Sequence, residues 1–137
     1  MRRRATITLH WLSFLLLILL VAGGPLPPLV WAFALSGLGL CALALVNGLM
    51  NGPGPKLEGA LRAAHPWLSR GMYAALGGVA ALGLWAQISG TAMNLNAIYF
   101  YLLSASSLHA IFHLWRHTAL GDGALRRITP TAMHGML

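Results

Sequence analysis

The sequence has little charge, almost no acid and a single cysteine. Of its 137 residues only 8% are charged and only 2 are Asp or Glu, whereas about a quarter of the residues of a soluble domain are charged. Cys41 stands alone in an apolar run, so neither an intrachain disulfide nor a cysteine-ligated metal site is available. The Cys-x-x-Cys-His motif that attaches haem covalently is also missing. These absences exclude a soluble domain, a disulfide scaffold and a c-type cytochrome.

The charge that is present is basic. There are 9 Lys and Arg residues against 2 acids, and 58% of the chain is hydrophobic. A basic excess can indicate nucleic-acid binding or the rim of a membrane protein. Phosphate binding needs a solvated basic surface, and no basic stripe on an otherwise polar fold is found here. We therefore expect no nucleic-acid partner and a protein embedded in membrane lipid.

Four apolar stretches predict four membrane-spanning helices in a single transmembrane domain, residues 1–137. Each is close to the ~20 residues that cross a bilayer, and clusters of Gly, Pro and Asn separate them. The first stretch resembles a signal peptide superficially, but its length favours an uncleaved helix. Pro66 fits the first turn of the third helix. We predict an all-α, integral membrane four-helix bundle with spans at about 5–23, 29–50, 67–88 and 97–118.

The distribution of charge predicts the orientation. With four spans, both termini and the middle loop lie on one side of the membrane. All the Lys and Arg residues lie on that side or within a turn or two of it, and the two opposite loops carry none. Because basic loops stay in the cytoplasm, we expect both termini to be cytoplasmic.

Histidines inside the spans are the candidate functional residues. His109, His113 and His117 recur at every fourth position and share a helix face, and His10 lies well inside the first span. Ionisable groups are costly at that depth and indicate function. At 1.5 Å per residue, His10 lies roughly 8 Å and His109 roughly 12 Å from the same membrane surface. Two imidazoles at one level can ligate the iron of a single haem b, so we predict His10 and His109 as its metal ligands.

The other histidines have weaker predictions. A buried histidine is more often a hydrogen-bonded structural group than a ligand. His113 is a competing haem ligand, or a hydrogen-bond donor to a haem propionate or a quinone. His117 lies near the interface, in a solvated or quinone-adjacent position. For His65, at the start of the third helix, we expect a plain N-terminal or headgroup role, and His134 in the tail receives none.

Arginines near the same level are candidate partners for haem propionates, which are carboxylates that accept charged hydrogen bonds. Arg70 is the best placed of them, followed by Arg4 and Arg116; the alternative is that they reach to the membrane interface. A di-iron site in a bundle needs carboxylates on the helices. Glu58 and Asp122 both fall in predicted loops, which excludes such a site.

Three blocks of sequence resemble a known family. They are Ile7–Leu12, the stretch from His65 to Gly83, and His109–His117 followed by Leu125-Arg126 and Pro130. Together they resemble the bacterial cytochrome b561 family of four-helix membrane haem proteins, which includes superoxide oxidase. The resemblance implies a bacterial inner-membrane protein in which His10 and His109 bind the cytoplasmic-side haem. It also places Arg116 and His117 near a quinone-binding region.

One departure from the family changes the expected function. Familiar members hold a second haem through histidines in the second helix and at the start of the fourth, and the corresponding positions here lie near Phe33 and Leu95. The chain thus resembles a one-haem relative. The resemblance implies electron exchange between this haem and a quinone such as ubiquinone, or other membrane redox subunits, which is quinone-linked oxidoreductase chemistry. One haem near one face cannot by itself carry electrons across the whole bilayer, so the resemblance does not decide whether superoxide on the far side is a substrate.

Two other functions remain open from the sequence. The chain could be a structural or accessory subunit of a larger redox or photosynthetic complex, with its second span used for packing. It could also be a small transporter with a histidine–arginine proton path, although no inverted repeat or interrupted helix supports this. The presence of haem discriminates among these functions.

Overall fold

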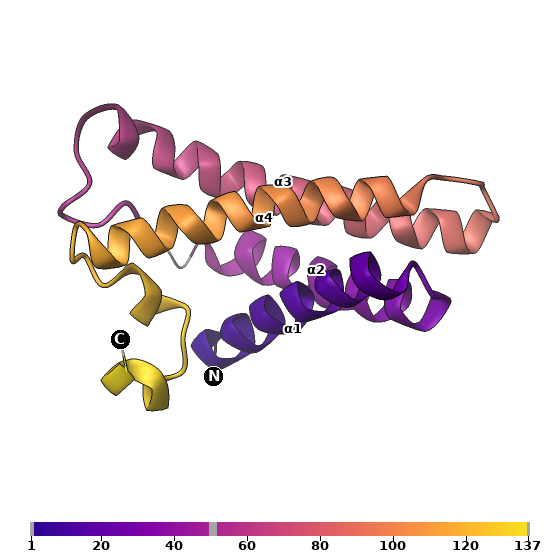
Figure 1. Ribbon diagram of the computed structural model, residues 1–137, viewed down its shortest axis with the longest axis horizontal. Helices are drawn as coiled ribbons and strands as arrows, with labels where there is room; N and C mark the ends of the chain where they lie inside the picture. The colour runs from indigo at the N-terminus through magenta and orange to yellow at the C-terminus, as the bar shows by residue number, and fades with distance from the viewer. Residues whose placement is uncertain (1, 50–51, 137) are drawn as a thin grey trace.

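The computed structural model describes residues 2–49 and 52–136, and within them it is helical with no strand (Figure 1). The four long helices are each long and apolar enough to cross a membrane, so the predicted all-α membrane bundle is confirmed and the chain is a multi-pass membrane protein. In order, the elements are α1 (Arg2–Gly23), α2 (Pro27–Asn47), α3 (Gly59–Ser89), α4 (Leu95–Thr118) and the short 3-10 helices η1 (Ala124–Arg127) and η2 (Thr131–Met136).

The connections at one end of the bundle are short and locally determined. Leu26 is extended before Pro27 and Pro28 open α2, as expected because proline suits the first helical turn. Gly90 ends α3 in the left-handed conformation with φ of 67°. The Asn94 side chain accepts a hydrogen bond from the amide of Ala97 (3.1 Å) and caps α4. Consecutive long helices therefore run antiparallel (Figure 1).

Some helix boundaries differ from those expected. α3 begins at Gly59, so Pro66 lies inside the helix and not in its first turn. The preceding segment is rich in alanine, which favours helix, and the proline removes only one backbone hydrogen bond. α2 ends at Asn47, and the predicted end of that span, Met50, lies outside the described residues. α4 begins at Leu95 because Asn94 caps it.

The helices do not pack evenly. α2 packs extensively against both α1 and α3, whereas α4 makes far fewer contacts with its neighbours α1 and α3. A buried apolar core fills the bundle towards the α1–α2 and α3–α4 connections. The looser packing of α4 leaves room for a cavity closer to the chain termini.

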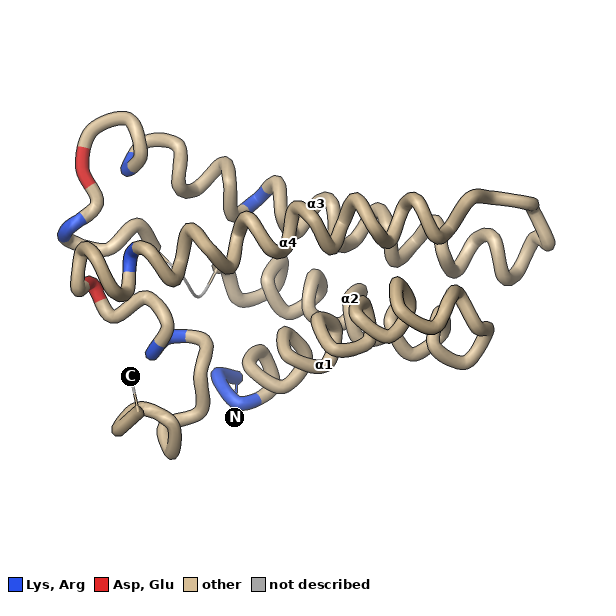
Figure 2. Tube along the Cα trace, in the orientation of Figure 1, with Lys and Arg blue, Asp and Glu red and all other residues tan. Residues whose placement is uncertain are grey.

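Figure 2 shows that all the described Lys and Arg residues gather towards the end of the bundle that holds both termini and the α2–α3 loop. We call this the basic end. The two connections at the opposite end carry no Lys or Arg, as the sequence predicted. Arg2 is bound tightly there, because its Nη2 donates to the carbonyls of Asn47 (2.5 Å) and Gly48 (3.1 Å) at the end of α2. The basic end is defined by Arg2, Arg3, Arg4, Lys56, Arg62, Arg70, Arg116, Arg126 and Arg127.

Candidate functional site: a cavity at the basic end

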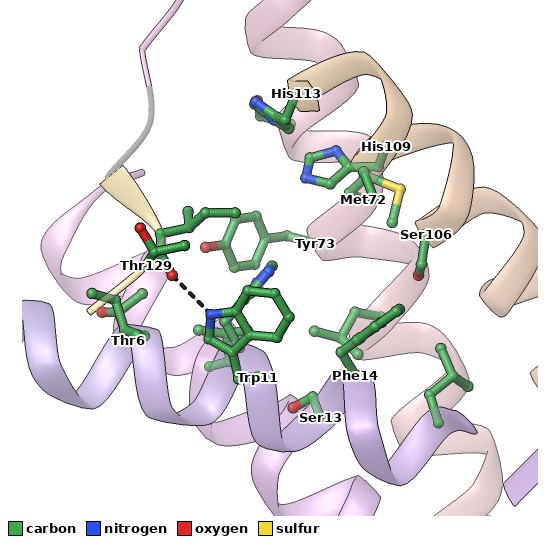
Figure 3. Close-up of a pocket in the computed structure, with 18 of the residues that line it drawn as sticks. Thr6, Trp11, Ser13, Phe14, Met72, Tyr73, Ser106, His109, His113 and Thr129 are labelled. Atoms are coloured by element: carbon green, nitrogen blue, oxygen red, sulfur yellow. Dashed lines mark hydrogen bonds between the residues drawn. The ribbon is translucent and has the colours of Figure 1, made fainter. Parts of the chain in front are cut away.

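A cavity of about 400 Å³ lies inside the basic end of the bundle. Its walls come from all four long helices and from the C-terminal segment, and its lining is mainly apolar (Figure 3). Cofactor sites in proteins usually have volumes of roughly 300–1,000 Å³ and mostly apolar walls. The cavity therefore has the size and character of a site for a small molecule or cofactor.

His10 from α1 and His109 from α4 both line this cavity. Among the described residues, neither imidazole has a hydrogen-bond partner. The His10 ring lies edge-on to the ring of Trp11 with centroids 5.9 Å apart, and the His109 ring lies edge-on to that of His113 at 4.5 Å. The alternative of a hydrogen-bonded structural histidine thus finds no partner group for either residue. The structure brings the two predicted ligands to one cavity with ring nitrogens available.

The other histidines of α4 are placed differently from one another. His113 is 3% exposed, lines the same cavity, and lies between His109 and His65, whose ring centroid is 6.1 Å from its own. His117 does not line the cavity; its Nδ1 is buried and has no hydrogen-bond partner among the described residues. His134 Nε2 lies 3.2 Å from the carbonyl oxygen of Thr129, within the C-terminal segment.

Small and polar side chains create the space. Ser69 from α3 and Ser106 from α4 both line the cavity, and their small side chains take up less of its space than the leucines elsewhere in its wall. Figure 3 shows Tyr73, Met72 and Ser106 around the cavity with His109. A hydroxyl or thioether in an apolar wall can orient a bound molecule. These residues could not be identified from the sequence, since isolated serines in an apolar helix carry no distinctive spacing.

Aromatic packing closes the inner end of the cavity. Phe33 lines it and is fully buried against Tyr99, with ring centroids 5.5 Å apart. The Tyr99 hydroxyl points at Gly83 and has no hydrogen-bond partner among the described residues. Leu95 is 7% exposed and belongs to the same apolar core. The region where the family resemblance would locate second-haem ligands is filled by these side chains.

Arg116 is fully buried at the end of α4. Its Nε and Nη2 donate to Asp122 Oδ2 at 2.7 and 2.5 Å, and both side chains of this ion pair are 0% exposed. Nη2 also donates to the carbonyl of Pro53 (2.6 Å), and Nη1 lies 2.8 Å from Nε2 of His65. The headgroup or N-terminal role predicted for His65 was wrong, because the longer α3 places this residue in the helix interior, 1% exposed, against Arg116.

The loops that enclose Arg116 depend on glycine and on a single aspartate. Gly54 has φ of 75°, and a Cβ there would lie 2.9 Å from Arg116 Nη2. Asp122 Oδ1 also accepts a hydrogen bond from the amide of Ala124 (2.9 Å). Asp122 was assigned only to a loop from the sequence. Its position six residues after Arg116, as the only Asp of the chain, is a signal that could have indicated the pair.

The predicted propionate partners do not line the cavity. Arg70 is exposed, and its guanidinium lies 5.3 Å from the ring centroid of Trp67. Arg116 is bound to Asp122 as described. Arg3 is bound to the cavity wall instead, because its Nη2 donates to the carbonyl of the lining residue Thr129 (3.1 Å).

Comparison with known proteins adds nothing to this geometry: no protein-family model, curated protein or solved structure matches the chain. Its function is therefore inferred from its own residues, and the cavity with its two available imidazoles is the feature that points to a ligand.

Proposed function

We propose that this protein is a membrane-embedded b-type cytochrome. It binds one haem b between α1 and α4 and passes single electrons between that haem and a quinone such as ubiquinone, or a partner redox subunit in the membrane. The observation that supports this is the pair His10 and His109, which reach one apolar cavity from two helices and have no hydrogen-bond partner among the described residues.

The donor set fits haem better than a bare metal ion. No group of three or more His, Cys, Asp or Glu side chains within residues 2–49 and 52–136 is arranged to hold a metal ion. Two imidazoles are enough for haem iron, because the porphyrin nitrogens supply its remaining ligands. The cavity volume of about 400 Å³ and its apolar lining also suit a planar macrocycle. The group supplies reversible one-electron chemistry when it is bound.

The surrounding side chains would tune the site. The apolar wall excludes water and lowers the local dielectric, which affects the potential of a buried redox centre. His113, beside His109, is placed to contact a ligand in the cavity. Arg116 is bound to Asp122, which leaves His117 as the candidate quinone contact, since its buried Nδ1 has no hydrogen-bond partner in the part of the chain that the structure describes.

The proposal also covers the membrane in which the protein lies and the side that its basic end faces. The basic end would face the cytoplasm because positively charged loops are retained there, and the resemblance to cytochrome b561 supports the bacterial inner membrane. The haem would then lie near the cytoplasmic surface, and electrons would be exchanged on that side of the bilayer.

The test is a reduced-minus-oxidised visible spectrum of the purified chain with pyridine-haemochrome quantification. We expect one b-type haem per chain, lost in both His10→Ala and His109→Ala and retained in the control His134→Ala, which alters a histidine outside the cavity. Absence of haem from a well-folded preparation would overturn the proposal and favour an accessory subunit. Two haems per chain would show that the packing around Phe33 and Tyr99 does not prevent a second site.

A further inference from the structure

The C-terminal segment, residues 124–136, is part of the cavity wall. Leu125, Ile128, Thr129 and Met133 line the cavity together with residues of the four helices. Figure 1 shows the segment leaving the end of α4 and reaching the N-terminal end of α1. It therefore covers the cavity at the basic end.

Three hydrogen bonds hold the far side of this segment to α1. The indole Nε1 of Trp11 donates to the carbonyl of Ile128 (2.9 Å; Figure 3). Arg3 Nη2 donates to the carbonyls of Arg126 (2.9 Å) and Thr129 (3.1 Å). All three run from side chains of α1 to backbone carbonyls, and each makes only a modest net contribution, the larger ones belonging to a charged donor such as Arg3. Trp11 directly follows His10, so one attachment lies beside the proposed haem ligand.

The near side of the segment is anchored at a glycine hinge. Gly121 and Gly123 both have positive φ, 59° and 69°, and glycine changes backbone conformation more readily than other residues. Asp122 between them is fixed by the buried ion pair with Arg116. Beyond the hinge the segment forms only the short 3-10 helices η1 and η2, which have little stability of their own.

We propose that residues 124–136 form a hinged cover that opens about Gly121–Gly123 and controls the entry of ligand into the cavity from the basic end. The segment is also held by Arg127 Nη1, which donates to the carbonyl of Gly52 (3.1 Å), and by the packing of η1 against α4. Opening therefore breaks these contacts as well as the three bonds to α1, while the four helices stay in place. The identity of the ligand as haem rests on the proposed function; the existence of the cover does not.

The first experiment measures the rate at which haem enters haem-free protein, from the rise of the Soret band after mixing with hemin. Trp11→Phe removes the indole donor, and Arg3→Gln removes the guanidinium, which is not part of the cavity lining. We expect Trp11→Phe to speed entry about three- to tenfold, the factor that the loss of one neutral hydrogen bond produces. Arg3→Gln removes a charged donor to two carbonyls, so we expect it to speed entry about tenfold or more. Matched controls are Trp85→Phe, an exposed indole on α3, and Arg4→Gln, an exposed neighbour of Arg3.

The second experiment needs no haem. Trypsin cleaves after Arg126 and Arg127 in the cover, and the released C-terminal peptides are followed by mass spectrometry. We expect faster release in Trp11→Phe and Arg3→Gln than in wild type or the two controls, since an open cover is a better protease substrate.

The outcomes separate the two proposals. If wild type binds no hemin, the proposed function fails, and the cleavage rates alone decide whether the cover opens. If hemin binds but entry is equally fast in all variants, the cover does not control entry, whatever the cleavage rates, and the ligand passes between helices from the lipid. Equal cleavage rates in all variants would show that Trp11 and Arg3 do not hold the cover closed.

Discussion

The two halves of this bundle use the same four helices in opposite ways. Towards the uncharged end, Leu20, Val30, Phe33 and Tyr99 are all 0% exposed and form a continuous apolar core. Towards the basic end, the same helices surround a cavity of about 400 Å³ that contains His10 and His109. The hydrophobicity of the helices does not explain the difference, because each is apolar enough along its length to span a membrane.

The difference comes from the size and polarity of the side chains that face inward. In the packed half, large rings and leucines meet small partners, as Tyr99 meets Gly83. In the open half, small side chains such as those of Ser69 and Ser106 line the cavity and leave space. The open half is instead held together beyond the cavity, at the end of α4, by the buried ion pair of Arg116 and Asp122. A membrane bundle can thus keep a cavity if polar contacts replace the packing that the cavity removes.

The largest expected effect on the free energy of unfolding comes from removing the buried ion pair. Arg116→Met leaves Asp122 buried without its cation and leaves the carbonyl of Pro53 and the His65 imidazole without their donor. Removing one partner of a buried pair costs about 3–5 kcal/mol, so we expect a loss of that size in the free energy of unfolding. Denaturation in mixed detergent micelles, followed by circular dichroism, measures it.

The matched control for Arg116→Met is Arg70→Met, which removes an exposed arginine from the same end of the bundle and should leave unfolding nearly unchanged. The double variant Arg116→Met with Asp122→Leu should recover part of the loss, because no buried charge remains. A single-variant loss of less than about 1 kcal/mol, the value of a surface pair, would show that the open half is held together by other contacts.

The second prediction concerns the packed half. A Cβ at Gly83 would clash with the Tyr99 hydroxyl and lie 3.3 Å from Val30 Cγ1. Overpacking of this kind costs about 1–3 kcal/mol, and Gly83→Ala should lower the unfolding free energy by that amount. Gly78→Ala, on the same helix with nothing within 4 Å of the added carbon, should instead stabilise slightly, by up to about 1 kcal/mol from helix propensity.

The cause of the Gly83 effect can be isolated with Tyr99→Phe. This change removes the hydroxyl that approaches Gly83, and that hydroxyl has no hydrogen-bond partner among the described residues. Gly83→Ala should therefore cost less in the Tyr99→Phe background than alone. If Gly83→Ala and Gly78→Ala change the free energy of unfolding by the same amount, the side chains around Gly83 can move enough to admit the added carbon atom.

The smallest expected effect lies where the halves meet. Ser13 on α1 donates from its hydroxyl to that of Ser36 on α2 (3.1 Å), and both residues are 4% exposed. Hydrogen bonds between membrane helices contribute on average about 0.6 kcal/mol, so Ser13→Ala should lower stability by about that amount in the same assay. Ser104→Ala, an exposed serine that bonds only within α4, is the control and should show no loss.

The sequence predicted much of the fold because the relevant forces are local. Apolar length predicted four spans, and clusters of Gly and Pro predicted where they end. The one large boundary error, at α3, arose because Pro66 was assumed to begin a helix, whereas the alanine-rich residues before it are helical too. The candidate site was predictable only in part. His10 and His109 were chosen by their depth in the membrane. For Arg116 and His65 the sequence predicted separate roles and did not predict that their side chains contact each other.

The sequence by itself determined the four apolar helices, the gathering of basic residues at one end and the spacing of the α4 histidines, since each follows from composition and helical period. Only the tertiary structure decided which of those histidines face the cavity. Successive positions four apart turn by about 40° around a helix, so His109 and His113 line the cavity while His117 does not. The tertiary structure also decided that Asp122 neutralises Arg116 and that the C-terminal segment covers the cavity. These contacts join residues from different helices and loops, and they depend on helix rotation and loop conformation, which no local pattern specifies.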